Sequence, residues 1–157
     1  MVKIDHSYRH IQRSPLCVLL YGITLLFLTI GWLLRAEPAM PWTFTSAAAF
    51  LFIVAGSFHY LAVSDEGTHL SVRFGPFPLF RRKVRFADIR RVETARTTLL
   101  DGWGIHYGFR RGWIWNIWGR DCVVLFLQQG ILRVGSDDAE RLANHVRSKL
   151  SEFTEDG

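Results

Sequence analysis

The chain has 157 residues and a formal net charge of +5, enough for one ordinary domain or for a membrane hairpin with a small domain. Its two cysteines, Cys17 and Cys122, are too few for a disulfide framework and lack the spacing of a metal site. The sequence pI near 9.7 comes without a recognised nucleic-acid-binding motif, so we expect no nucleic-acid partner.

The distribution of charge divides the chain near Ser64. The mean hydropathy of the whole chain is only +0.12, because an apolar first part is averaged with a charged second part. We therefore predict a cytoplasmic tail over residues 1–13, a transmembrane hairpin over 14–60, a cytoplasmic domain over 61–150 and a frayed tail over 151–157. The charged residues before the boundary are Lys3, Asp5, Arg9, Arg13, Arg35 and Glu37.

Two long uncharged segments predict the hairpin. Residues 14–34 would form a helix of about 31 Å, close to the thickness of a bilayer's hydrocarbon core. Residues 38–64 are also uncharged, and we predict a second helix over 41–60, with Pro41 in its first turn and Trp42 and Tyr60 at the two interfaces. A cleaved signal peptide is disfavoured, because the first apolar run is too long and is followed by a poor cleavage site. His59, near a helix end, is interpreted as an interfacial side chain and not as a proton relay.

Lysine and arginine predict the orientation of the hairpin. They flank both outer ends of the two spans, whereas the short connecting loop contains only Arg35. By the positive-inside rule, both termini should lie in the cytoplasm.

The second half of the chain predicts short strands and one helix. Period-two alternation and turn residues favour strands over residues 60–64, 69–74, 80–86, 89–98, 112–117, 121–128 and 131–134. Strand 121–128 is apolar on both faces, so we expect burial on both sides. Asp137 and Glu140 resemble a capping box, and an apolar stripe follows at helical spacing: Ala139, Leu142, Ala143, Val146 and Leu150.

Several segments resemble the bacterial, membrane-anchored pleckstrin-homology-like (PH-like) domains. They are Ser71–Pro76, Ile89–Glu93, Gly102–Ile105, Gly112–Trp113 and Arg133–Asp138. The resemblance covers roughly residues 60–150 and implies an α+β fold: a two-helix transmembrane hairpin, then an antiparallel β-sandwich or open barrel with a C-terminal capping helix. It also implies a bacterial inner-membrane location. The closing helix lacks a Trp and no basic phosphoinositide signature is present, so inositol-lipid binding is not carried over.

Two surfaces are candidate binding sites. A basic patch for anionic lipid comprises Arg81, Arg82, Lys83, Arg85, Arg90 and Arg91; the alternative is a solvated strand face that also serves as a topology signal. A candidate interface is rich in aromatic side chains and comprises Trp103, Tyr107, Phe109, Arg110, Arg111, Trp113, Trp115 and Trp118. If residues 113–118 form a strand, its two faces both carry Trp. One set should then be core, and the other covered by a partner, by lipid or by a neighbouring loop.

Signatures of catalysis, metal binding and cofactor binding are absent from the sequence patterns. The six histidines are scattered, no nucleophile elbow or phosphate loop is present, and the Asp137–Glu140 carboxylates are explained by helix capping. We therefore predict a non-catalytic, membrane-tethered binding or scaffolding module without a cofactor, which contacts the bilayer and an unidentified protein and self-associates. The alternatives are an accessory subunit of a transporter or channel and a membrane-bound enzyme.

Overall fold

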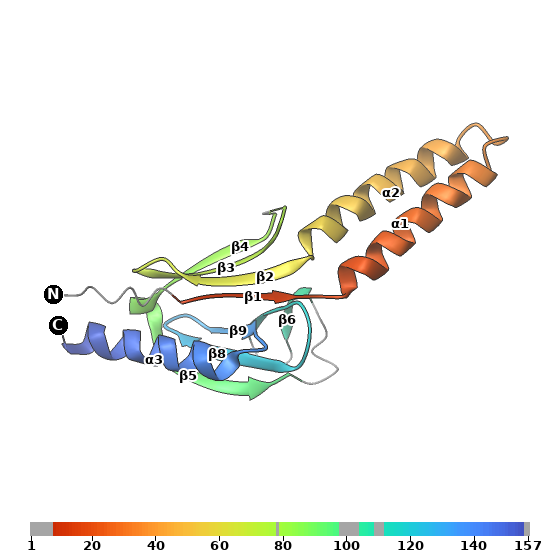
Figure 1. Ribbon diagram of the computed structural model, residues 1–157. Coiled ribbons are helices and arrows are strands. Elements are labelled where there is room, and N and C mark those ends of the chain that lie inside the picture. Colours follow the sequence, from red (N-terminus) through yellow and green to blue (C-terminus); the bar gives the residue numbers. More distant parts are fainter. Residues whose placement is uncertain (1–7, 78, 98–103, 109–111, 156–157) are drawn as a thin grey trace.

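A computed structural model of the chain describes residues 8–77, 79–97, 104–108 and 112–155. Two antiparallel helices project from one end of a domain built from two β-sheets, and a third helix packs along the domain (Figure 1). The architecture is therefore α+β, with an apolar hairpin followed by two sheets and a C-terminal helix.

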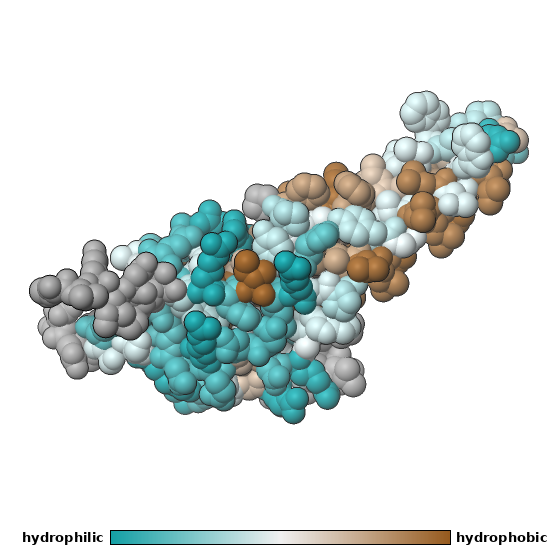
Figure 2. All heavy atoms as spheres, in the orientation of Figure 1, coloured by the Kyte–Doolittle hydropathy of each residue, from teal (hydrophilic) through white to brown (hydrophobic). Residues whose placement is uncertain are grey.

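The hairpin consists of α1 (Leu16–Leu33) and α2 (Met40–Ser57). Both helices are long and apolar enough to cross a membrane, and only 17% and 22% of their residues are buried. Figure 2 shows apolar surface concentrated on this projecting hairpin, while the domain is mainly hydrophilic. The two helices approach closely at Gly31, where a Cβ atom would lie 3.0 Å from the Cβ of Phe44. The hairpin thus packs on itself and leaves its apolar side chains facing outward.

The first sheet contains a strand that the sequence did not indicate. Its order is β1 (Arg9–Arg13), β2 (Tyr60–Asp65), β3 (His69–Gly75) and β4 (Arg81–Arg85), all antiparallel. The prediction of a tail over residues 1–13 is therefore wrong for Arg9–Arg13. The only apolar residue of β1, Ile11, points outward, so the strand carries no apolar alternation. It exists because β2 offers it a backbone partner.

The boundary between α2 and the domain also differs from the prediction. The helix ends at Ser57, and Tyr60 is the first residue of β2 instead of the last residue of a span. His59 donates its backbone N–H to the Gly75 carbonyl oxygen at 3.1 Å. Pairing with the sheet therefore begins two residues after the helix ends.

The second sheet has the order β5-β8-β9-β7-β6. Its strands are β5 (Ile89–Arg96), β6 (Gly104–Gly108), β7 (Gly112–Asn116), β8 (Asp121–Leu127) and β9 (Ile131–Gly135). Strands β5, β8 and β9 form an antiparallel meander, and β7 pairs with β9 in parallel. The β6–β7 hairpin is therefore an insertion between β5 and β8 that extends the sheet beyond β9. A short 3₁₀ helix, η1 (Phe86–Asp88), connects the two sheets.

The core lies between the sheets and under α3 (Ala139–Glu155). The predicted inward positions Leu70, Val72 and Phe74 are fully buried, whereas Phe80, also predicted to point inward, is 39% exposed just before β4. The apolar stripe of α3 is confirmed: Ala139, Leu142, Ala143 and Val146 are buried, and Leu150 packs against the core.

Both faces of β8 are buried, as predicted, within this one chain: Cys122 and Val124 on one face, Val123 and Leu125 on the other.

The two ends of α3 differ from the prediction. The helix begins at Ala139, not directly after Asp137, and the Ser136 hydroxyl oxygen accepts the Asp138 N–H at 3.1 Å. At its other end the helix continues to Glu155, so residues 151–155 are helical and not a frayed tail. Residues 156 and 157 lie outside the described part of the chain.

Candidate interface at the base of the helical hairpin

The hairpin joins the first sheet without a linker. Only Ser14 and Pro15 separate β1 from α1, and only Phe58 and His59 separate α2 from β2. The Ser14 N–H donates to the His59 carbonyl oxygen at 3.3 Å, so the two connections are bonded to each other. The two helices are therefore continuous with two neighbouring, hydrogen-bonded strands.

Side chains of β1 and its connection tie the junction to the second sheet as well. The Ser14 hydroxyl donates to the Ile117 carbonyl oxygen at 3.3 Å, and its oxygen accepts the Leu16 N–H at 3.1 Å, at the start of α1. The Gln12 side-chain amide donates to the Trp118 carbonyl oxygen at 2.8 Å. Both sheets thus hold the base of the hairpin in a fixed direction.

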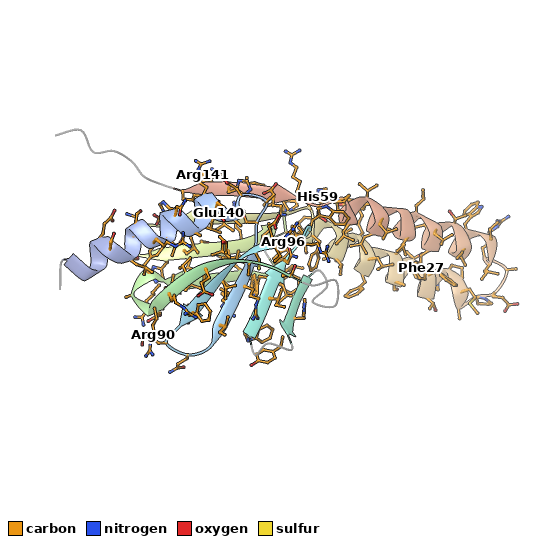
Figure 3. All side chains as sticks on the ribbon, turned by 90° about the horizontal axis from the view of Figure 1, so that it is seen from below. Phe27, His59, Arg90, Arg96, Glu140 and Arg141 are labelled. Atoms are coloured by element: carbon orange, nitrogen blue, oxygen red, sulfur yellow. The ribbon has the colours of Figure 1, made fainter. Side chains whose placement is uncertain are left out.

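His59 lies at this base, where the hairpin meets the domain (Figure 3). Its Nε2 atom is 2.7 Å from the Tyr21 hydroxyl oxygen, and the two rings meet edge to face. The Tyr21 ring also lies 5.5 Å from that of Phe52 on α2. The histidine therefore connects the start of the domain to α1.

The β3–β4 turn packs beside the last turn of α2. A Cβ atom at Gly56 would overlap the Phe77 ring, so only glycine permits this approach. The Phe58 ring lies 5.0 Å from Phe74 and 5.8 Å from Phe80, which links the helix end to both strands of the turn. Phe77 and Phe80 keep about two fifths of their surface exposed.

The residues of the predicted basic patch divide between the two sheets. Arg81–Arg85 form β4 at the edge of the first sheet, whereas Arg90 and Arg91 belong to β5 of the second. Figure 3 shows Arg90 at the end of the domain away from His59. They do not form one continuous stripe.

Most of these cations have a carboxylate partner. Glu66 accepts from both Arg81 (2.9 Å) and Lys83 (2.6 Å), and the Lys83 hydrogen bond lowers the pKa of Glu66. Asp88 pairs with Arg85 at 2.8 Å, and this hydrogen bond lowers the pKa of Asp88.

Two other members of the patch, Arg91 and Arg82, have different surroundings. Arg91 contacts Glu93 at 3.3 Å and lies over the Phe126 ring. Burial lowers the pKa of Arg82. The predicted patch is therefore closer to a solvated, ion-paired strand face than to an open cationic surface.

A different set of arginines lies near the hairpin. The strand register places Arg73 opposite Arg81. This pair lies two residues along the strands from the pair Arg13 and Tyr60, so all four side chains share the outer face of the first sheet. Among the described residues, no ion pair of Arg13 or Arg73 is found. From the sequence, these two arginines indicate only the membrane orientation. That they share a face depends on the pairing of β1 with β2.

The predicted aromatic interface is only partly a surface. Trp115 is 7% exposed and packs in the core, 5.8 Å from Phe74, so its assignment to an interface is wrong. Trp115 belongs to the cluster of buried apolar residues that fills the sandwich. Tyr107 and Trp113 are 62% and 44% exposed and meet edge to face at 5.9 Å.

The other members of the aromatic set lie elsewhere. Trp118 is partly exposed in the turn after β7, and its carbonyl oxygen accepts from Gln12. Trp103, Phe109, Arg110 and Arg111 lie outside the described residues. On the opposite face of the strand Ile114 and Asn116 are buried too, in agreement with the expectation that both faces are covered.

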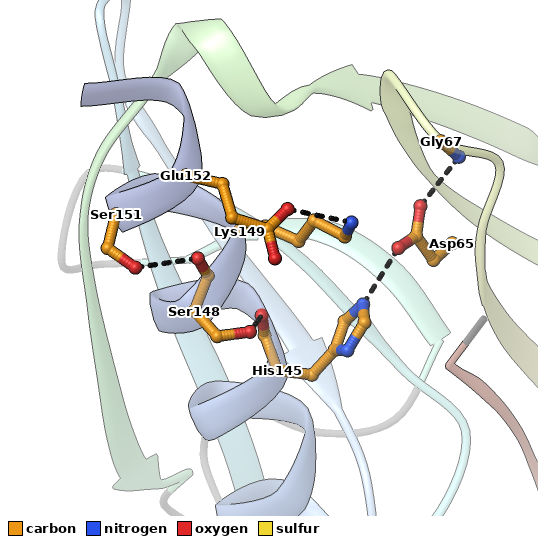
Figure 4. Close-up of polar contacts among 7 residues, drawn as sticks. All are labelled: Asp65, Gly67, His145, Ser148, Lys149, Ser151 and Glu152. Carbon is orange, nitrogen blue, oxygen red and sulfur yellow. Dashed lines mark hydrogen bonds and ion pairs between the residues drawn. The ribbon is translucent and has the colours of Figure 1, made fainter. Parts of the chain in front are cut away.

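A buried polar contact, not anticipated from the sequence, fastens α3 to the first sheet (Figure 4). His145 Nε2 is 2.9 Å from Asp65 Oδ2, and Asp65 Oδ1 accepts the Gly67 N–H at 2.6 Å. The Tyr8 ring stacks on His145 at 5.3 Å. Burial is the largest cause that raises the pKa of Tyr8 to about 12, followed by the charge of Asp138.

An acidic cavity of about 380 Å³ lies where α3 begins; its lining includes Arg96, Asp121, Asp137, Asp138 and Glu140. Its carboxylates already have partners: Arg96 contacts Asp121 at 2.9 Å, Thr94 donates to Glu140 at 3.2 Å, and Asp137 contacts His10. Within the described ranges, no group of three or more His, Cys, Asp or Glu is arranged to hold a metal ion.

Comparison with known proteins adds no assignment. No protein-family model matches the sequence, and no curated protein matches it. The function must therefore be inferred from the geometry of the chain itself.

Proposed function

We propose that the protein is a membrane-anchored binding module, whose apolar hairpin crosses the bilayer and whose sandwich makes protein or anionic-lipid contacts at the cytoplasmic membrane surface. One observation carries this proposal: the hairpin connects two adjacent, hydrogen-bonded strands, β1 and β2, of the same sheet. An anchor joined in this way orients the domain as well as retaining it. The module acts by holding its binding surfaces at the membrane, and it does not catalyse a reaction.

The exposure of the hairpin supports membrane insertion. Its outward side chains include Val18, Leu25, Trp32, Trp42 and Phe50, which water would solvate poorly. The helices contact the domain only at their base (Figure 1), so the domain itself cannot cover them. A bilayer supplies the missing apolar surroundings along the full length of both helices.

Strand topology is consistent with a PH-like domain carrying two insertions. Without β6 and β7, the domain has a four-stranded antiparallel sheet, a three-stranded meander and a C-terminal helix. The hairpin then occupies the β1–β2 connection, and β6–β7 the connection between β5 and β8. Inositol-lipid binding through a β1–β2 loop is not part of the proposal, because that position is taken by the hairpin.

Orientation follows from charge and connectivity together. Strands β1 and β2 share one sheet, so both outer ends of the hairpin lie on the same side of the bilayer. Arg13 at one end and Arg73 and Arg81 near the other favour the cytoplasmic side under the positive-inside rule. In this arrangement the loop between α1 and α2 lies on the opposite side.

Cysteine labelling in intact cells tests the proposal. In a Cys17→Ala/Cys122→Ala background, Ala39→Cys in the hairpin loop should react with an impermeant maleimide added from outside. The matched variant Gln129→Cys, in the turn between β8 and β9, should react only after the membrane is opened. Labelling of Gln129→Cys from outside would overturn the orientation, and release of the protein from membranes by alkaline carbonate would overturn the anchor.

A further inference from the structure

The β3–β4 turn places exposed apolar side chains directly beside the base of the hairpin. Phe77, Leu79 and Phe80 are 42%, 59% and 39% exposed. They are adjacent in the chain and follow a strand whose inward residues are fully buried, so their exposure is local to the turn. In Figure 1 this turn is the part of the β3–β4 pair nearest to α2.

The turn is held firmly against the helix. The Phe74 N–H donates to the Phe80 carbonyl oxygen at 3.0 Å, and the Leu79 N–H donates to the Phe77 carbonyl oxygen at 2.8 Å. On its other side, the His59 N–H donates to the Gly75 carbonyl oxygen at 3.1 Å. The exposed side chains therefore have a fixed position relative to the end of α2.

The apolar surface of the turn continues that of the hairpin. The Phe77 ring packs on Gly56, in the last turn of α2, and leaves part of its surface free. Arg73 and Arg81 lie behind the turn, opposite Ala62 and two residues along the strands from the Arg13–Tyr60 pair. The apolar side chains lie at the tip of the turn and the cations lie further back along its strands. This order matches that of acyl chains and phosphates in a leaflet.

We propose that the β3–β4 turn inserts Phe77, Leu79 and Phe80 into the interfacial layer of the same leaflet that α2 enters. This inference rests on the membrane anchoring proposed above and adds a third point of attachment to the two helices. Three points that are not in line fix the tilt of a rigid domain, so the turn determines which surface of the sandwich faces away from the membrane.

Spin-label accessibility of the full chain tests this contact. In the Cys17→Ala/Cys122→Ala background, a nitroxide is attached at Leu79→Cys and the protein is placed in nanodiscs of phosphatidylcholine and phosphatidylglycerol. Collision with oxygen should exceed collision with a water-soluble nickel complex. The matched control is Thr68→Cys, at the opposite end of β3, where the nickel complex should collide more often.

A third label separates the two proposals. Phe50→Cys, on the exposed side of α2, reports whether the hairpin is in the bilayer. If Phe50 is protected from nickel but Leu79 is as accessible to it as Thr68, the turn does not insert, and the anchor stands. If Phe50 is also accessible to nickel, the anchor itself is wrong. Retention of the wild-type circular dichroism spectrum in each variant ensures that the labels report on the folded domain.

Discussion

Asp65 is the single side chain on which the attachment of α3 to the first sheet most depends. Its two carboxylate oxygens accept from His145 and from the Gly67 backbone, and it is almost fully buried. Removing this acceptor is costly at His145, whose side chain is nearly buried, whereas the exposed Gly67 N–H can bond to water instead.

We expect Asp65→Ala to lower the free energy of unfolding by about 1–3 kcal/mol, since it leaves the nearly buried His145 side chain without its acceptor. The measurement is chemical denaturation of the purified full chain, followed by circular dichroism. Asp88→Ala is the matched control: its partner Arg85 is well exposed, so we expect a much smaller loss of stability. Equal losses in the two variants would refute the importance of the buried contact.

Tyr8 makes the stability of the domain sensitive to alkaline pH. Its pKa is about 12 in the folded chain and about 10 when unfolded, so the unfolded chain loses its proton first as pH rises. Below about pH 10 the neutral Tyr8 phenol makes its full contribution to the free energy of unfolding. As the pH rises towards 12 this contribution, about 2–3 kcal/mol, is lost.

Tyr8→Phe removes this ionisation. The difference in unfolding free energy between Tyr8→Phe and the unsubstituted protein should therefore shift in favour of the variant between about pH 10 and 12. Denaturation at a series of pH values measures the difference directly. A difference that is constant over this range would show that Tyr8 does not ionise differently in the two states.

Among the elements, β6 is the strand most suited to contact another chain. Within the described part of the chain its one strand partner is β7, and the exposed Tyr107 and Trp113 rings lie against each other on these two strands. An edge strand with aromatic side chains favours pairing with a second strand. We propose this edge for the self-association that the sequence predicts.

We expect the double substitution Tyr107→Ser/Trp113→Ser to reduce self-association in detergent, measured as molar mass by light scattering after size exclusion. Both side chains are largely exposed, so the fold should persist, with a stability change of about 1 kcal/mol or less. Trp118→Ser, outside β6 and β7, is the control. An unchanged molar mass for the double variant would eliminate the β6 edge as the interface.

The elements also differ in how well the sequence predicts them. Helices α1 and α2 were predicted from the length of their uncharged apolar runs, and α3 and β3 from apolar residues at helical or strand spacing. All of these signals are local to the segment that carries them. Strand β1 could not be predicted from Arg9-His10-Ile11-Gln12-Arg13. Its single apolar residue, Ile11, points outward, and its buried residue, Gln12, is polar. The parallel pairing of β7 with β9 likewise depends on residues far apart in sequence.

At the scale of the whole molecule, the absence of a linker between hairpin and sandwich is the main mechanical feature. The Ser14–His59 backbone contact and the Gln12 and Ser14 contacts to the second sheet make the base a single unit. Under the proposed function, rotation of the domain about the hairpin axis is therefore restricted, and the orientation of its surfaces is set by the fold.

A flexible insertion should separate anchoring from orientation. We expect several Gly and Ser residues inserted between Phe58 and His59 to leave the protein in the membrane but to expose a nitroxide at Leu79→Cys to the aqueous nickel complex. An insertion of the same length in the β8–β9 turn, next to Gln129, is the control and should leave the accessibility unchanged. Loss of membrane retention in the first variant would instead indicate that the junction is needed for insertion.

The sequence by itself determined the two apolar spans, their charge flanks, the inward face of β3 and the buried stripe of α3. Each of these is a local pattern: the spans and their flanks follow from uncharged length and nearby charge, and the other two from strand or helical periodicity. Tertiary structure alone decided that β1 pairs with β2, that Trp115 is core and that the basic residues divide between two sheets. The uncharged run at residues 14–34 predicts a helix wherever it lies, but its rigid connection to the domain arises only when strands distant in sequence form one sheet.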